Sequence, residues 1–212
     1  MRFVRCRGGL AVTGLAASAL ALGLAPLLMP ASYSWVAHTT SESAAQGVAG
    51  AWLARGGFMA FGLTVVMVAF IAQGRWGRWA VGLHTTFGVL MMAAGVFSAR
   101  SWDEQMTFSQ LEDLLHSVAA TGMGFAFAGG VALVALQRWK GYEGWRVIDI
   151  VAVTASVALP LAMLGAPGLT GVFQRAMFLV AYLWYGLEAA QSRGRRSHGN
   201  AGQHPRRPTP SP

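Results

Sequence analysis

Residues 52–99 read WLARGGFMAFGLTVVMVAFIA (52–72), QGRWGR (73–78) and WAVGLHTTFGVLMMAAGVFSA (79–99). A short basic segment with Arg75 and Arg78 thus joins two long apolar runs. A helix needs about 20 apolar residues, at about 1.5 Å each, to cross a hydrocarbon core of about 30 Å. Both runs have that length, and neither shows the period-two alternation of a membrane strand. The stretch therefore predicts two membrane helices joined by a turn.

The same kind of apolar run recurs along the chain. Of its 212 residues 54% are hydrophobic and 11% are charged, whereas a soluble domain carries about 25% charged residues. Most of the surface must therefore face lipid. We predict an all-α bundle of six transmembrane helices, forming a single membrane domain over residues 1–190. The predicted spans are 8–29, 52–72, 79–99, 113–136, 147–165 and 172–190.

The basic residues indicate how the spans are oriented. With the N-terminus inside, thirteen of the sixteen lysines and arginines fall on the inner side, and only Arg55, Arg100 and Arg175 fall on the outer side. Cytoplasmic loops carry such an excess of positive charge. We therefore expect both termini to be cytoplasmic. Because the basic residues lie in short clusters between apolar runs, the net charge of +8 does not predict nucleic-acid binding.

The two ends of the chain need separate interpretation. Arg2, Arg5 and Arg7 before an apolar run resemble a secretory signal peptide, but no good cleavage site follows, so we expect a retained first helix. Cleavage would leave five spans.

Residues 191–212 are rich in Arg, Gly, Pro and Ser and predict a disordered, cytoplasmic tail. The single cysteine, Cys6, excludes an internal disulfide.

Polar residues gather near the outer ends of the predicted spans and in the outer loops. Ionisable groups inside a membrane are costly and usually face the bundle interior, so Arg55 and Arg175 are expected to have acidic partners or water. Three interpretations stay open: an ion-pair network closing the outer end of the bundle, a binding or catalytic pocket, and a scattered, solvated set. The candidate outer cluster is Ser41, Glu42, Arg55, Glu112, Asp113, His116 and Arg175.

A metal site is one alternative within this cluster. Two histidines and a carboxylate, with water, form an accepted catalytic zinc set. His38, Glu42 and His116 could supply it, with Glu112 or Asp113 as base. The sequence has no HExxH or CxxC motif to set the spacing. We therefore predict no cofactor and no metal unless that alternative holds.

The inner half of the bundle has fewer ionisable groups. His84, Asp149 and Glu188 lie within the predicted spans, and His84 with Asp149 is a candidate pair. The spans carry almost no titratable group at mid-depth, which argues against a proton-coupled transporter.

For helix packing, the small residues Gly122, Ala126 and Gly130 predict that the fourth span lies centrally.

Several short motifs resemble one family. They are Tyr33-Ser-Trp35, Thr40-Ser-Glu-Ser43, Arg55-Gly-Gly-Phe58, Asp113-Leu-Leu-His-Ser117 and Gly171-Val-Phe-Gln-Arg175 with Trp184. Over roughly residues 10–190 the chain resembles the bacterial domain-of-unknown-function family 998, a group of six-helix membrane proteins. The loop after the first span is more distantly similar to the eukaryotic Frag1/DRAM/Sfk1 membrane proteins. The resemblance implies a six-span fold in a bacterial plasma membrane and no established activity.

The sequence leads to one function hypothesis and two alternatives. We expect a non-enzymatic, multi-pass membrane protein in the lipid bilayer that binds a small ligand, a lipid head group or a protein partner at the outer cluster. The alternatives are a metal-dependent membrane hydrolase at the same residues and a small-molecule transporter. The substrate, the ligand and the oligomeric state do not follow from the sequence.

Overall fold

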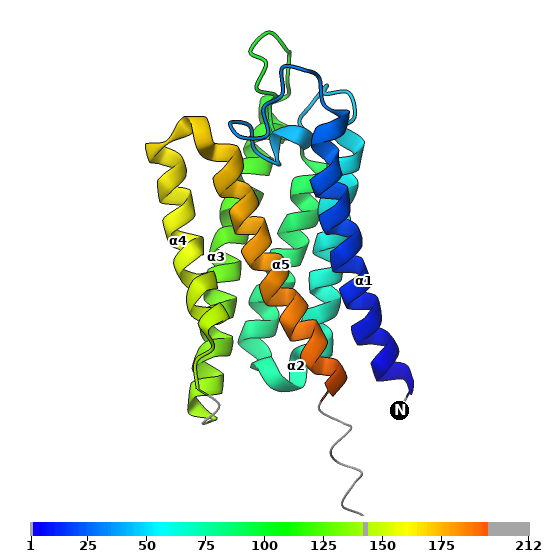
Figure 1. The fold of residues 1–212 in the computed structure, drawn as a ribbon, viewed down its shortest axis with the longest axis vertical. Helices are drawn as coiled ribbons and strands as arrows, with labels where there is room; N and C mark the ends of the chain where they lie inside the picture. The colour runs from blue at the N-terminus through cyan, green and yellow to red at the C-terminus, as the bar shows by residue number, and fades with distance from the viewer. Residues whose placement is uncertain (1, 142–143, 195–212) are drawn as a thin grey trace, which may run out of the picture.

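The computed structural model describes residues 2–141 and 144–194, and all regular elements in this part of the chain are helical. Five α-helices and three short 3-10 helices follow one another (Figure 1). The all-α fold class expected from the sequence is thus confirmed. The elements are α1 (Arg2–Leu24), η1 (Ala25–Leu28), η2 (Glu42–Ala44), α2 (Ala51–Val96), α3 (Gln110–Lys140), α4 (Val147–Gly165), η3 (Pro167–Leu169) and α5 (Thr170–Gly194).

The six predicted spans do not appear as six separate membrane helices. Four helical segments are long and apolar enough to cross a membrane: 8–28, 51–96, 110–140 and 147–165. The predicted second and third spans both fall within α2, and the sixth lies in the more polar α5. Pro160 lies inside α4 without ending it, since the helix continues to Gly165. The predicted tail lies outside the described residues from residue 195 onward.

Helix α2 reverses direction within its 46 residues. Gly77 has φ 68° and ψ 161°, a conformation outside the helical region that glycine adopts without the steric cost of a side chain. An unbroken helix of this length would extend about 69 Å, more than twice the hydrocarbon thickness. Figure 1 shows the two limbs, 51–76 and 78–96, side by side with the turn between them at the bottom of the bundle.

The two limbs of α2 approach each other closely at a pair of glycines. A β-carbon placed on Gly88 would lie 2.6 Å from the carbonyl oxygen of Gly62. Helix association in lipid depends on such backbone proximity, because burial of apolar side chains from lipid gives little driving force. The predicted small-residue face of α3 packs on the second limb, with Gly122 against Leu90 and Gly130 against His84.

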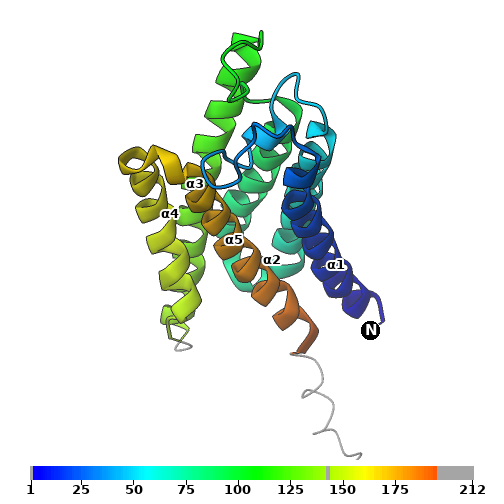
Figure 2. The same ribbon diagram turned by 45° about the horizontal axis from the view of Figure 1, so that its top comes forward.

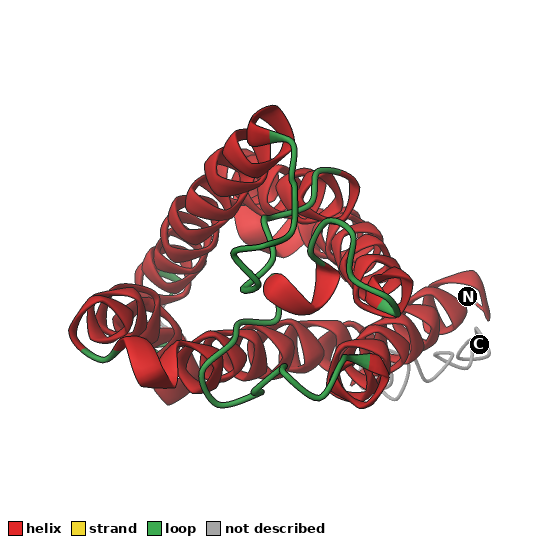
Figure 3. Ribbon diagram, turned by 90° about the horizontal axis from the view of Figure 1, so that it is seen from above, coloured by secondary structure: helices red, strands yellow, loops and turns green. Residues whose placement is uncertain are grey.

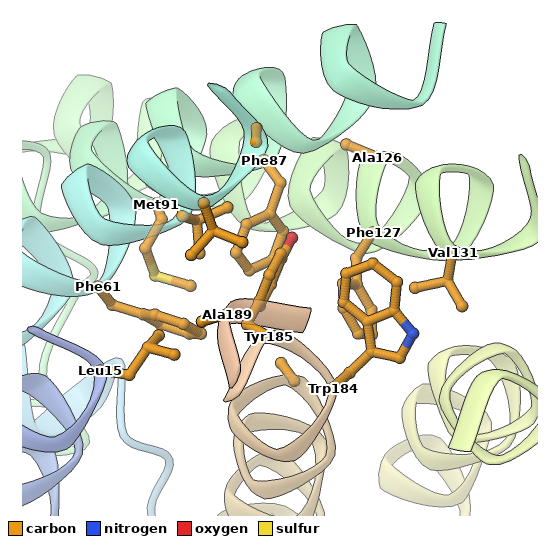
Figure 4. Close-up of a cluster of buried hydrophobic side chains, with 14 of the residues drawn as sticks. Leu15, Phe61, Phe87, Met91, Ala126, Phe127, Val131, Trp184, Tyr185 and Ala189 are labelled. Atoms are coloured by element: carbon orange, nitrogen blue, oxygen red, sulfur yellow. The ribbon is translucent and has the colours of Figure 1, made fainter. Parts of the chain in front are cut away.

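Helix α5 passes through the bundle and contacts α1, α2 and α4. It runs diagonally between α1 and α4 in Figures 1 and 2. The fourth span, now α3, is predicted to lie centrally with contacts on two faces. It does have two neighbours, α2 and α4, whereas α5 contacts three helices. Figure 4 shows the ring of Tyr185 on α5 among apolar side chains of the neighbouring helices, including Phe87 and Phe127.

Seen from above, the helices outline a triangle and the outer loops lie over its interior (Figure 3). The N-terminal end of α1, the turn within α2, the end of α3, the start of α4 and the end of α5 lie at the opposite end (Figure 1). We call these the outer and the inner end, following the expected orientation. Each end carries a layer of polar side chains, and the two layers differ in chemistry.

The glycine contact between the limbs predicts a position-specific effect on stability. We expect Gly88→Ala to destabilise the bundle by about 1–3 kcal/mol, because the added methyl group has no space against the Gly62 carbonyl. Gly82→Ala, in the same limb with nothing within 4 Å, is the matched control and should be neutral or stabilising by up to about 1 kcal/mol. Thermal unfolding of both variants in detergent measures the difference, and equal behaviour would contradict the packing described.

Candidate functional site

Arg175 attaches the first outer loop to α5. Its Nη1 donates to the carbonyl oxygens of Trp35 (2.6 Å) and His38 (2.9 Å), and to that of Gly171 one turn earlier (3.0 Å). Its Nη2 donates to the Tyr33 hydroxyl at 2.7 Å. Burial raises the pKa of Tyr33, although the Arg175 charge opposes that shift. Arg175 therefore supports irregular backbone that would otherwise lack hydrogen-bond donors.

Arg55 plays a similar part at the other end of the same loop. Its Nε donates to the carbonyl oxygen of Ala44 and its Nη2 to that of Ala45, each at 2.9 Å. These carbonyls lie at the end of η2. Between described side chains, every ion pair of the structure lies at the inner end. Of the expected partners of Arg55 and Arg175, acids or water, the described residues supply no acid in an ion pair, and backbone carbonyls take that place.

The acidic and hydroxyl side chains of the first loop also form hydrogen bonds within the loop or to α5. Glu42 accepts hydrogen bonds from the Thr39 backbone N–H (2.6 Å) and hydroxyl (2.8 Å). Ser41 is held to α5 by Gln174, which accepts from the Ser41 N–H at 3.2 Å and donates to its hydroxyl at 3.3 Å. Both candidate residues thus hold the loop in shape and in place.

The candidates on α3 hold the second outer loop. Asp113 accepts a hydrogen bond from the Arg100 N–H at 2.8 Å, and Glu112 a long one of 3.5 Å from the Ser98 N–H. His116 is buried, and its Nδ1 donates to the carbonyl oxygens of Ala94 and Phe97 at the end of α2. The structure therefore places these three residues against the second loop, whereas Ser41, Glu42 and Arg175 surround the first.

The three candidate metal ligands are engaged separately. His38 accepts the Ser34 N–H at its Nδ1 (2.9 Å) and stacks on Trp102 with ring centroids 5.2 Å apart. Glu42 and His116 bond to backbone groups of different loops. Within residues 2–141 and 144–194, no group of three or more His, Cys, Asp or Glu side chains is arranged to hold a metal. The zinc alternative has no support in this geometry.

The inner layer is a compact buried ion cluster. Arg138 of α3 donates through Nη1 to both carboxylate oxygens of Asp149 on α4, at 2.7 and 2.6 Å. Its Nη2 donates to Glu188 of α5. The three residues are 9%, 1% and 2% exposed. Buried charges are tolerated only when they are paired and hydrogen-bonded, so this contact links α3, α4 and α5.

Aromatic side chains complete the hydrogen bonding of the two carboxylates. Trp76, beside the Gly77 turn, donates to Glu188, and Trp184 donates to Asp149, each at 2.8 Å. The Trp184 ring stacks on His84 with centroids 4.8 Å apart. The His84 Nδ1 lies 2.8 Å from the Tyr185 hydroxyl. The predicted pairing of His84 with Asp149 is therefore wrong, because Trp184 lies between them and Arg138 neutralises the acid.

Two further arginines surround this cluster at the inner surface. Arg146 at the start of α4 lies 3.3 Å from Glu188, and Arg75 lies 3.6 Å from it. Their side chains are 35% and 24% exposed, so both reach solvent or lipid head groups. Arg75 also donates to the backbone carbonyl of Glu188 and to the side chain of Gln191.

A pocket of about 160 Å³ opens beside these arginines. Three guanidinium groups and one carboxylate line it, and Asp149 lies behind Arg138. Counted over the described residues, the cluster therefore has three positive and two negative charges, an excess of one positive charge. The lining residues are Gly74, Arg75, Trp76, Val134, Gln137, Arg138, Gly141, Arg146, Glu188 and Gln191.

Sequence reasoning did not predict this pocket. The sequence indicates only the orientation of the spans through Arg75, Arg138 and Arg146. It places Glu188 within a span but predicts no partner for it. One signal was available: basic residues and tryptophans adjoin one another at every inner turn, as in Arg75-Trp76, Arg138-Trp139 and Trp145-Arg146. In the structure the arginines of all three pairs line the pocket, and of the tryptophans Trp76 donates to the cluster.

The buried cluster predicts a strong dependence of folding on Arg138. We expect Arg138→Met to destabilise the protein by about 3–5 kcal/mol, because Asp149 and Glu188 would lose their shared partner inside the bundle. Lys140→Met removes the same charge from an exposed position of the same helix and should have little effect. Thermal unfolding in detergent distinguishes the two, and equally stable variants would refute the role given to Arg138.

The family model described as "Protein of unknown function (DUF998)" matches residues 11–191, a range that contains both polar layers. No curated protein and no solved structure matches the chain. The resemblance seen in the loop and helix motifs is thereby confirmed for this family, while the likeness to the Frag1/DRAM/Sfk1 proteins stays a prediction. Since the match covers most of the chain, the protein belongs to the DUF998 family of proteins of unknown function.

Proposed function

We propose that this membrane protein binds a small anionic group, of the phosphate class, in the pocket at its inner end. One observation carries the proposal: three arginines and two carboxylates surround a pocket of about 160 Å³, leaving one positive charge in excess. Guanidinium groups bind phosphate through paired hydrogen bonds. The partial exposure of Arg75 and Arg146 gives a ligand access to two of them.

The ligand-binding site proposed here lies in the inner layer, whereas the sequence predicts one in the outer layer. The outer candidates make hydrogen bonds to loop backbone and to each other, so a structural role accounts for their contacts. The hydrolase alternative lacks a metal-ligand group among the described residues. Transport would need a polar path between the layers, whereas Phe61, Phe87 and Phe127 fill the described interior there. A binding protein without catalysis fits these contacts best.

The proposed topology has six crossings with both termini in the cytoplasm. Two features support it: α2 turns back at Gly77, and its limbs pack through Gly62 and Gly88. With α5 as the last crossing, the arginine-rich links lie together on one side, as the positive-inside rule requires. The pocket then faces the cytoplasm, and we assign the protein to a bacterial plasma membrane.

The topology predicts different accessibility for the two sides. Because Cys6 is the single cysteine, Cys6→Ser gives a background for new cysteines. Asp103→Cys in the second outer loop should react with a membrane-impermeant maleimide added to intact cells. Gln73→Cys, beside the Gly77 turn, should react only after the membrane is permeabilised. Both positions are exposed, so burial cannot explain a difference. The reverse pattern would invert the topology.

The anion site predicts stabilisation by inorganic phosphate. We expect phosphate, at constant ionic strength with chloride as reference, to raise the melting temperature of the purified full-length protein, because a ligand that binds only the folded state stabilises it. Arg146→Gln should remove this response while the protein stays folded, since Glu188 keeps Arg138 and Trp76 as partners. Arg78→Gln, at the same end but outside the pocket lining, should keep it. A response that is absent, or the same in both variants, contradicts the proposal.

A further inference from the structure

Resting on the proposed function, we infer that the anionic group bound in this pocket is the phosphodiester head group of an anionic phospholipid. The lipid would belong to the leaflet at the inner end of the bundle. Its glycerol and acyl chains would stay in the bilayer, beside the helices, and only the phosphate would enter the pocket. Four features of the pocket support this ligand: its depth, its size, its charge and its donors.

Exposed tryptophans indicate the depth of the pocket. Trp79, Trp139 and Trp145 are 69%, 60% and 53% exposed, and all three lie near the pocket-lining segments. Tryptophan is enriched at the level of the lipid head groups. The pocket beside Arg138 and Arg146 therefore opens at the depth where lipid phosphates lie, rather than in bulk water.

The size of the pocket favours a small group. Pockets that enclose drug-sized or nucleotide-sized ligands have volumes of about 300–1,000 Å³, whereas this one has about 160 Å³. A cavity of about 150 Å³ accommodates a ligand as small as benzene. A phosphodiester with its adjoining carbons fits such a volume, while a whole nucleotide does not.

The charge of the cluster matches a single negative charge. A phosphodiester in a phospholipid carries one negative charge at neutral pH, which would balance the excess of one positive charge around the pocket. A zwitterionic lipid would also bring an ammonium group close to Arg75 and Arg146, and like charges in close contact disfavour binding. The cluster therefore selects an anionic lipid over a zwitterionic one.

The donors for the phosphate oxygens come from separate helices. Arg146 begins α4, Arg75 precedes the turn in α2, and Gln137 and Gln191 on α3 and α5 add side-chain amides to the lining. Arg138 is shared between Asp149 and Glu188, and Trp76 adds only a hydrogen bond to Glu188, so Arg75 and Arg146 balance both Glu188 and the ligand. Bound phosphate would thus bridge four helices.

Arg78 provides a control for nonspecific attraction to a charged membrane. Its guanidinium carbon lies 4.9 Å from the centre of the Trp79 ring, and the residue does not line the pocket. Any basic residue near the surface attracts anionic lipid to some extent. Only a pocket residue should do so with selectivity for one kind of head group.

The test uses the delipidated full-length protein in mixed micelles with added dioleoylphosphatidylglycerol, with dioleoylphosphatidylcholine or with inorganic phosphate. Binding is followed by melting temperature and by native mass spectrometry of retained lipid. We expect phosphatidylglycerol to bind about tenfold more tightly than phosphatidylcholine. Arg146→Gln should weaken its binding about tenfold, the effect of one lost charge-assisted hydrogen bond. Arg146→Lys should restore part of the binding, and Arg78→Gln should leave it unchanged.

The possible outcomes separate this inference from the proposed function. If phosphate stabilises the protein through Arg146 but phosphatidylglycerol binds no better than phosphatidylcholine, the lipid inference fails and the anion site stands. If neither phosphate nor phosphatidylglycerol binds through Arg146, both fail. If Arg78→Gln weakens phosphatidylglycerol binding as much as Arg146→Gln does, the lipid is attracted by the basic surface alone and the inference is overturned.

Discussion

The Arg138 guanidinium, buried between Asp149 and Glu188, is the interaction on which the inner half of this bundle depends. It joins three helices directly, and Trp76 adds the fourth by donating to Glu188. The buried interior of the bundle offers Arg138 and Asp149 little contact with water, so each must find its partner within the protein. Ion pairs with Arg138 and hydrogen bonds from the Trp76 and Trp184 indoles supply these partners. The same contacts hold the turn of α2 close to the ends of α3 and α5.

Arginine satisfies a different need at the outer end. There the chain forms irregular loops over the bundle, and their backbone carbonyls need donors where secondary structure supplies none. Arg55 and Arg175 each bind two or more such carbonyls. One residue type therefore stabilises both ends of the molecule, through carboxylates at the inner end and through backbone oxygens at the outer end. The contacts of the outer arginines are made with the loops, whereas the inner cluster retains an excess charge.

The length of the apolar runs was sufficient to predict the all-α fold class and the bounds of some helices. The predicted span 147–165 coincides with α4, and the basic segment 73–78 contains the turn at Gly77. The partners of polar side chains could not be predicted in the same way. Whether His84 meets Asp149 depends on which helices are neighbours and on how they are rotated, and neither follows from hydropathy. The burial of Arg138 could not be predicted for a related reason. A basic residue at the end of a span indicates the orientation of that span equally well whether it is buried or exposed.

The position of Glu188 explains why a ligand at the inner pocket would affect the whole inner end. An anion close to this carboxylate is repelled unless the charge of Glu188 is balanced. Arg138 is shared with Asp149 and Trp76 adds only a hydrogen bond, so Arg75 and Arg146 supply the remaining positive charge. Arg75 and Arg146 can then face the ligand from the exposed side. Arg146 immediately precedes α4 and Arg75 immediately precedes the Trp76–Gly77 turn. Occupation of the pocket would therefore draw together the start of one helix and the reversal of another, two segments that both contact Glu188.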